Sequence, residues 1–135
     1  MNQQLQDIAL SCMNGAESGR MTFPQIVQTL IQAGFDGYLV DFRQGRVTYY
    51  LPDGDSVQFD AAHAKHTVAE TFDAAAVRQA IREAQLLVPG YTYGGFCRTV
   101  TAAGCAGYFV SFLGKRVLYF GRTAEIHTEH FPGTT

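Results

Sequence analysis

The chain repeats itself at an offset of seventy residues, and this constrains its fold more than any other feature. Residues 22–51 and 92–121 align without a gap, with eleven identities over thirty positions, whereas chance at this composition gives about two. The identical pairs fall at a helix start, a helix-ending glycine, one strand face and a hairpin: Thr22/Thr92, Thr29/Thr99, Ala33/Ala103, Gly34/Gly104, Gly37/Gly107, Tyr38/Tyr108, Val40/Val110, Phe42/Phe112, Arg46/Arg116, Val47/Val117 and Tyr49/Tyr119. The 135 residues are therefore expected to form one domain of two repeats, about 1–70 and 71–135.

Each repeat begins with two predicted helices. Apolar residues recur at helical spacing over 5–13, and Asn14-Gly15 and Ser18-Gly19 are expected to stop that helix. Thr22 is the expected N-cap of the next helix and Gly34 its expected C-cap. In the second repeat, apolar residues recur at helical spacing over 74–84 and again over 96–100. The first of these helices is expected to end at Pro89-Gly90 and the second at Gly104.

Three predicted strands follow each helix pair. The apolar period changes to two after Gly34 and Gly104, with turns expected at Gly45, Gly54 and Gly114. The expected strands are residues 38–42, 47–51, 57–59, 108–112, 117–120 and 126–132. The predicted fold class is therefore α+β, a helix-helix-strand-strand-strand unit used twice, with helices on one face of antiparallel sheet. One six-stranded sheet and two packed three-stranded sheets both fit this pattern.

The predicted strands are apolar on both faces. One face carries Tyr38, Val40, Val47 and Tyr49 and their counterparts, and should pack on the helices. The other face carries Leu39/Phe109, Thr48/Leu118 and Tyr50/Phe120. In a sheet with one face in solvent, apolar and polar residues alternate along each strand. Because the second face here is also apolar, we expect the other repeat, a second subunit or a ligand to cover it.

Two functional hypotheses follow from the apolar strands. The first is a non-enzymatic interaction module, a homodimer or a binder of another protein, that uses the second sheet face. The alternative is a small-molecule binding protein or enzyme with a pocket between the repeats. Its expected lining residues are Tyr38, Tyr49, Tyr108, Tyr119, Arg46 and Arg116. Arg46 and Arg116 are the charged residues shared by both repeats. Either they form an anion or partner site, or their aliphatic stems simply cover the aromatic surface beside them.

Charge and composition argue against several classes of function. The net charge is -2 without a basic run, which makes nucleic-acid binding unlikely. No apolar stretch approaches the roughly 20 residues of a membrane helix, and the N-terminus does not resemble a signal peptide. Residues 1–70 carry four basic and eight acidic side chains (-4), and residues 71–135 carry six and four (+2). This difference reflects either uneven surface charge or recognition between halves or between chains.

The histidines and cysteines are the remaining candidates for chemistry. His63, His66, His127 and His130 form two pairs of equal spacing. Each pair is expected to follow the third strand of its repeat, and the two pairs could meet at a metal ion with Glu129. Against this, the imidazoles can simply face solvent. The odd count of three cysteines favours reduced thiols in a cytoplasmic protein. Cys97 is either a nucleophile near a helix start or a core residue like its counterpart Val27.

No cofactor motif or catalytic triad occurs, so we expect no cofactor and no catalytic residue is assigned. The second repeat resembles a known family. Its motifs are Tyr93-x-x-Phe96-Cys97, Ala102-Ala103-Gly104, Tyr108-Phe109-Val110, Leu118-Tyr119-Phe120 and Glu129-x-Phe131-Pro132. These resemble the YbcV/YdfO-like group of uncharacterised, prophage-associated bacterial proteins, some labelled "phage envelope protein". The resemblance is best over 91–132 and fainter over 22–59. It implies a small α+β domain without an established activity.

Overall fold

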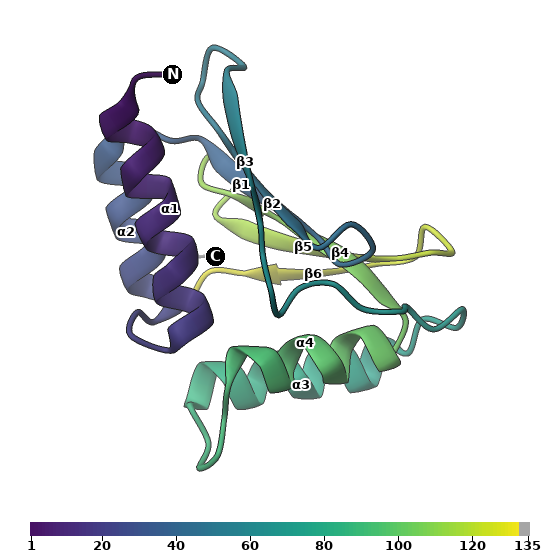
Figure 1. The fold of residues 1–135 in the computed structure, drawn as a ribbon. Coiled ribbons are helices and arrows are strands. Elements are labelled where there is room, and N and C mark those ends of the chain that lie inside the picture. The colour runs from purple at the N-terminus through teal and green to yellow at the C-terminus, as the bar shows by residue number, and fades with distance from the viewer. Residues whose placement is uncertain (133–135) are drawn as a thin grey trace.

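Residues 1–132 fold into four helices and one six-stranded antiparallel sheet. The computed structural model describes residues 1–132, and the elements alternate as two helices and three strands in each half (Figure 1). The helices are α1 (Gln3–Ser18), α2 (Phe23–Ala33), α3 (Ala74–Leu86) and α4 (Tyr93–Ala102). The strands are β1 (Gly37–Asp41), β2 (Arg46–Tyr50), β3 (Ser56–Asp60), β4 (Cys105–Ser111), β5 (Arg116–Gly121) and β6 (Ile126–His130). The α+β fold class is confirmed, while an origin by duplication stays a prediction.

The two halves join into a single sheet through their first strands. The strand order is β3-β2-β1-β4-β5-β6, with β1 antiparallel to β4 and Leu39 opposite Phe109. The alternative of two packed three-stranded sheets is therefore wrong. Because the second half extends the sheet sideways, it does not cover the face of the first half.

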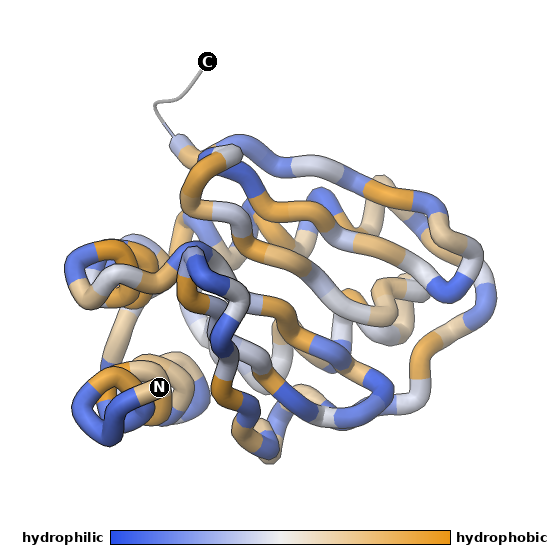
Figure 2. Tube along the Cα trace, turned by 90° about the horizontal axis from the view of Figure 1, so that it is seen from above, coloured by the Kyte–Doolittle hydropathy of each residue, from blue (hydrophilic) through white to orange (hydrophobic). Residues whose placement is uncertain are grey.

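Both helix pairs lie on the same side of the sheet. In Figure 1, α1 and α2 stand to the left of the strands and α3 and α4 lie beneath them, and the right-hand face carries no helix. We call the helix-covered face the inner face and the other the outer face. In Figure 2 the strands carry orange, pale and blue segments, so apolar and polar residues are mixed along them. None of the helices within residues 1–132 is long and apolar enough to cross a membrane.

The helix boundaries follow the caps that the sequence predicts, with two exceptions. Thr22 accepts from Gln25 N in a capping box, and Gly34 ends α2 with φ of 96°. However, α1 runs through Asn14-Gly15 and ends only at the second predicted stop, Ser18, with Gly19 as its C-cap. A Cβ at Gly15 would collide with the Met21 side chain, so glycine allows the close packing there. Helix α3 ends at Leu87, which takes a left-handed φ of 47° before Pro89 is reached.

The second hairpin turns at a different residue from the one predicted. In the β1–β2 hairpin Gly45 has φ of 68°, as expected for a glycine turn. In the β4–β5 hairpin the positive φ, 50°, falls on Lys115, seventy residues later, and not on Gly114. The geometry of the turn therefore recurs at the same offset although the glycine does not.

Aromatic side chains form the centre of the inner face. Tyr38 pairs with Tyr49 across β1 and β2 at 5.4 Å between ring centroids, and Tyr108 pairs with Tyr119 across β4 and β5 at 5.3 Å. All four are buried under the helices. Cross-strand aromatic pairs stabilise a sheet by about 0.5–1.5 kcal/mol beyond the area they bury. This aromatic ladder fixes the register of the four central strands.

Candidate functional site

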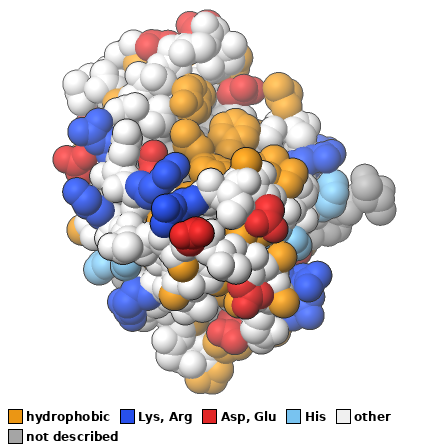
Figure 3. Space-filling model, turned by 90° about the vertical axis from the view of Figure 1, so that its right-hand side faces the viewer, with side chains coloured by type: hydrophobic (Ala, Val, Ile, Leu, Met, Phe, Trp, Pro, Cys, Tyr) orange, Lys and Arg blue, Asp and Glu red, His pale blue; other side chains and the backbone are white. Residues whose placement is uncertain are grey.

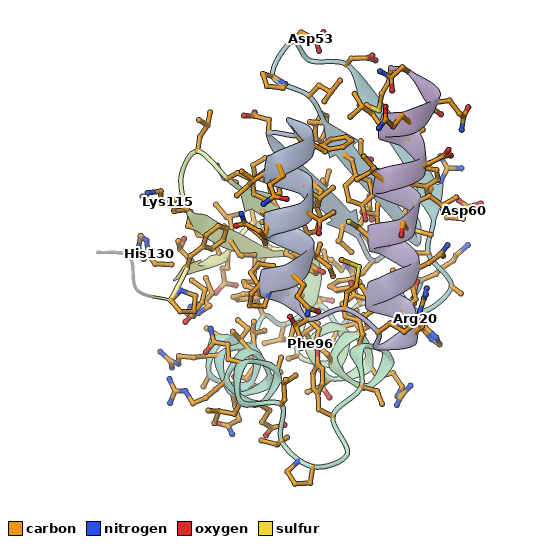
Figure 4. The ribbon with its side chains drawn as sticks, turned by 90° about the vertical axis from the view of Figure 1, so that its left-hand side faces the viewer. Arg20, Asp53, Asp60, Phe96, Lys115 and His130 are labelled. Atoms are coloured by element: carbon orange, nitrogen blue, oxygen red, sulfur yellow. The ribbon has the colours of Figure 1, made fainter. Side chains whose placement is uncertain are left out.

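A small cavity lies between the inner face and the two helix pairs. Its lining residues come from α1, α2, β1, β2, β4, the connection after β3 and the first residue of α4: Cys12, Met13, Ala16, Glu17, Ile26, Tyr38, Val40, Val47, Tyr49, Ala61, Tyr93 and Tyr108. The cavity has a volume of about 30 Å³, which is room for two or three water molecules. The lining residues with partial exposure are Ala16, Glu17 and Tyr93, so the cavity approaches solvent where the helix pairs meet. Figure 4 shows this junction, with Arg20 at the end of α1 and Phe96 beside it.

The cavity holds several phenol groups. Tyr93 Oη and Tyr108 Oη are 2.8 Å apart and share a hydrogen bond. Within residues 1–132, the hydroxyls of Tyr38 and Tyr49 form no hydrogen bond. Burial raises the pKa of each of these four tyrosines well above its ordinary value. The phenols therefore stay protonated at neutral pH and can donate hydrogen bonds.

One carboxylate enters this cavity. Glu17 lies in the last turn of α1, and its side chain is only 14% exposed. Its Oε1 accepts from the backbone N of His63 at 3.3 Å. Its Oε2 is buried and has no hydrogen-bond partner among the described residues, although His63 Nε2 lies 3.8 Å away. A buried carboxylate oxygen without a donor is costly, so this atom needs an explanation.

The predicted pocket residues fall into two groups. Tyr38, Tyr49 and Tyr108 line the cavity between the two halves, and Tyr119 packs against Tyr108 beside it. Arg46 and Arg116 are exposed on the outer face and do not reach the cavity. The strand period already separates them, because Arg46 and Tyr49 differ by an odd number of residues. Arg46 contacts Asp60 at 3.3 Å, and Arg116 donates to the Gly114 carbonyl.

The two histidine pairs lie apart: the first is in the connection after β3, where His66 N donates to the Phe42 carbonyl, and the second is on the edge strand β6. His63 and His66 follow β3, and His66 Nε2 lies 2.8 Å from the His63 carbonyl. His127 and His130 lie on β6, where His127 contacts Glu129 at 2.8 Å. Among the described residues, no three His, Cys, Asp or Glu side chains come together in a group that could hold a metal ion. The structure therefore does not bring the two pairs into one site.

The three cysteines are buried core residues. Cys12, Cys97 and Cys105 are each at most 1% exposed. Burial raises the pKa of Cys97 to about 12, which suppresses its thiolate and hence its nucleophilicity. The reading of Cys97 as the core counterpart of Val27 is thus the one that its burial supports.

One protein family matches most of the chain. A family profile described as "Protein of unknown function (DUF1398)" matches residues 12–130. The chain belongs to the DUF1398 family. The match begins within α1 and includes all six strands. The residues that line the cavity of this DUF1398 chain therefore all lie within the matched residues. A comparison with curated proteins found no match.

Glu17 and Tyr93 are the cavity residues that sequence reasoning missed. A signal for Glu17 exists: the stripe at 5, 8, 9, 12 and 13 continues to 16 and 17, which places a carboxylate on the apolar side of α1. Tyr93 stands four residues before Cys97, on the stripe of α4. A charged residue on an apolar stripe is the pattern that would have identified the site.

The outer face of this DUF1398 chain is the second candidate site. Its middle row crosses all six strands and contains Gln58, Thr48, Leu39, Phe109, Leu118 and Thr128. The Phe120 ring lies across Gly107 and the Phe109 ring reaches Gly37, so both rings lie along the sheet. Figure 3 shows hydrophobic side chains gathered on this side with charged ones around them. Phe109 is 37% exposed and Ile126 57%.

Proposed function

We propose that the protein is a non-enzymatic self-association module that binds a second copy of itself through the outer face. The observation that carries this proposal is an apolar sheet centre, with Leu39, Phe109 and Leu118 side by side, over which no element of residues 1–132 packs. An antiparallel sheet that only faces water alternates apolar with polar residues, and this one does not.

The charges of the outer face favour a second copy as the partner. Asp41, Arg46 and Asp60 form a net negative corner beside β3, and Arg116 with His130 forms a positive corner at the diagonally opposite end of the sheet. Two copies packed face to face with their strands crossing near 90° would place each acidic corner on a basic one. In the same arrangement Phe120 and Ile126 of one copy would contact Phe120 and Ile126 of the other copy.

The size of the face predicts a weak dimer. Six strands spaced about 4.8 Å apart and five residues long, at about 3.4 Å per residue, cover roughly 500 Å². Specific interfaces bury about 800 Å² of accessible surface per partner, so this face lies at the lower end. We therefore expect a dimer that dissociates on dilution and is not obligate.

Sedimentation equilibrium over a wide concentration range tests the proposal. The wild-type chain should move from monomer to dimer as concentration rises, and Phe109→Lys should remain monomeric because it places a charge in the centre of the interface. Leu86→Lys, at the exposed end of α3, is the matched control and should dimerise like wild type. A wild-type chain that stays monomeric throughout, or Phe109→Lys that dimerises normally, would contradict it.

Small-molecule binding in the cavity is the second candidate function. Three of the four tyrosines expected in such a pocket line this cavity, together with a carboxylate whose Oε2 lacks a donor. A cytoplasmic location and the prophage-associated YbcV/YdfO-like relationship stay predictions and carry neither candidate.

A further inference from the structure

The placement of Glu17 breaks two local rules of stability. Its Oε2 is buried without a donor, and its charge lies in the last turn of α1, where the helix dipole is negative. Both effects disfavour a carboxylate relative to a neutral side chain of the same shape. Local rules of this kind are broken chiefly at functional sites. Glu17 is therefore better explained by what it binds than by what it stabilises.

The chemistry of the cavity selects its ligand. A carboxylate oxygen without a donor attracts a cation that carries N–H groups and repels an anion. The rings of Tyr38, Tyr49 and Tyr108 supply aromatic walls, and aromatic surfaces favour a cation over a neutral group. The volume of about 30 Å³ admits two or three heavy atoms. We propose that this cavity binds the ammonium group of a small primary amine, with Glu17 Oε2 as its counter-ion.

The charge of Glu17 already acts on the groups around the cavity. The pKa of Tyr49 is raised by burial first, then by neighbouring groups that include Glu17. The pKa of Cys97 is likewise raised chiefly by burial, with a smaller contribution from Glu17. In both cases Glu17 acts in the direction expected of a negative charge beside the cavity, which is the charge that an ammonium group would meet.

His63 is the internal competitor of such a ligand. Its Nε2 is 3.8 Å from Glu17 Oε2, and its side chain is 52% exposed at the mouth. At this separation no hydrogen bond forms, so Glu17 Oε2 keeps its capacity to accept from a closer donor. If His63 were the true partner of Glu17, replacing Glu17 would lower stability and the cavity would bind no amine.

The test is a titration with ethylammonium chloride, followed by backbone amide NMR shifts. Acetate and ethanol are the matched anionic and neutral probes of similar size, and sodium chloride controls for ionic strength. Ethylammonium should shift the amides of Glu17, Tyr49 and Tyr93 in a saturable manner, whereas the three controls should not. Glu17→Gln keeps the shape of the side chain and should weaken binding at least tenfold without lowering the melting temperature.

Three results would overturn the proposal. They are no saturable shift with ethylammonium, equal shifts with ethanol or acetate, and unchanged amine binding by Glu17→Gln. A melting temperature that falls in Glu17→Gln, with no amine binding by wild type, would assign Glu17 to the His63 pair. The proposal specifies the ligand of the second candidate function and is independent of self-association. Glu17→Gln should dimerise like wild type, so failure of one proposal is distinguishable from failure of the other.

Discussion

At the residue scale, a glycine can be required for two separate reasons: a positive φ, or a lack of space for a Cβ atom. Gly54 and Gly104 have nearly the same φ, +91° and +90°. Around Gly54 nothing would contact a side chain, but at Gly104 a Cβ atom would collide with the backbone carbonyl of Thr71. The connection after β3 therefore packs directly on the end of α4, and only glycine permits that approach.

This pair gives a matched test of backbone packing. Gly54→Ala should lose about 1 kcal/mol of unfolding free energy, because alanine pays only the left-handed penalty. Gly104→Ala should lose at least about 3 kcal/mol, because the collision adds to that penalty. Urea unfolding of both variants measures the difference. Equal losses would mean that the connection moves aside freely and does not pack as described.

At the element scale, the inner face concentrates groups that must stay uncharged. Tyr38, Tyr49, Tyr93, Tyr108 and Tyr119 are packed between the sheet and the helices, and burial is the first cause of the raised pKa of each. In the unfolded chain a tyrosine ionises near pH 10. Above that pH the unfolded state therefore binds fewer protons than the folded state, and stability falls as pH rises.

Alkaline unfolding should accordingly be cooperative and steep. Each tyrosine contributes a slope of about 1.4 kcal/mol per pH unit, so five give about 7 kcal/mol per unit. Since domains are stable by about 5–15 kcal/mol, unfolding should begin within roughly two units above pH 10. The phenolate absorbance of these five tyrosines should change in the same step as the circular dichroism. Gradual ionisation of all seven tyrosines before circular dichroism changes would refute the buried ladder.

The strands and caps were predictable because their signals are local. Thr22 and Gly34 carry their own capping chemistry, and the alternation at Tyr38 and Tyr49 assigns the inner face without tertiary information. The contact between Glu17 and His63 was not predictable. It depends on the course of residues 61–72, a segment without any period, and on how the two helix pairs meet over the sheet.

At the scale of the whole molecule, the joining of β1 to β4 decides what remains exposed. Two sheets packed face to face would have hidden the apolar second faces, whereas one continuous sheet leaves them on the outside. The sequence already places apolar residues on both faces of the strands, but the choice between these arrangements depends on pairing across seventy residues. The self-association that we propose is a consequence of that choice.

The most direct measurement is methyl NMR over a dilution series, because it identifies which surface meets the partner. Leu39, Leu118 and Ile126 lie on the outer face, whereas the exposed Leu86 and Leu113 lie at the end of α3 and in a hairpin. The account predicts that methyl signals of the first three shift with concentration while those of Leu86 and Leu113 stay constant. Shifts confined to Leu86 or Leu113, or no concentration dependence at all, would contradict it.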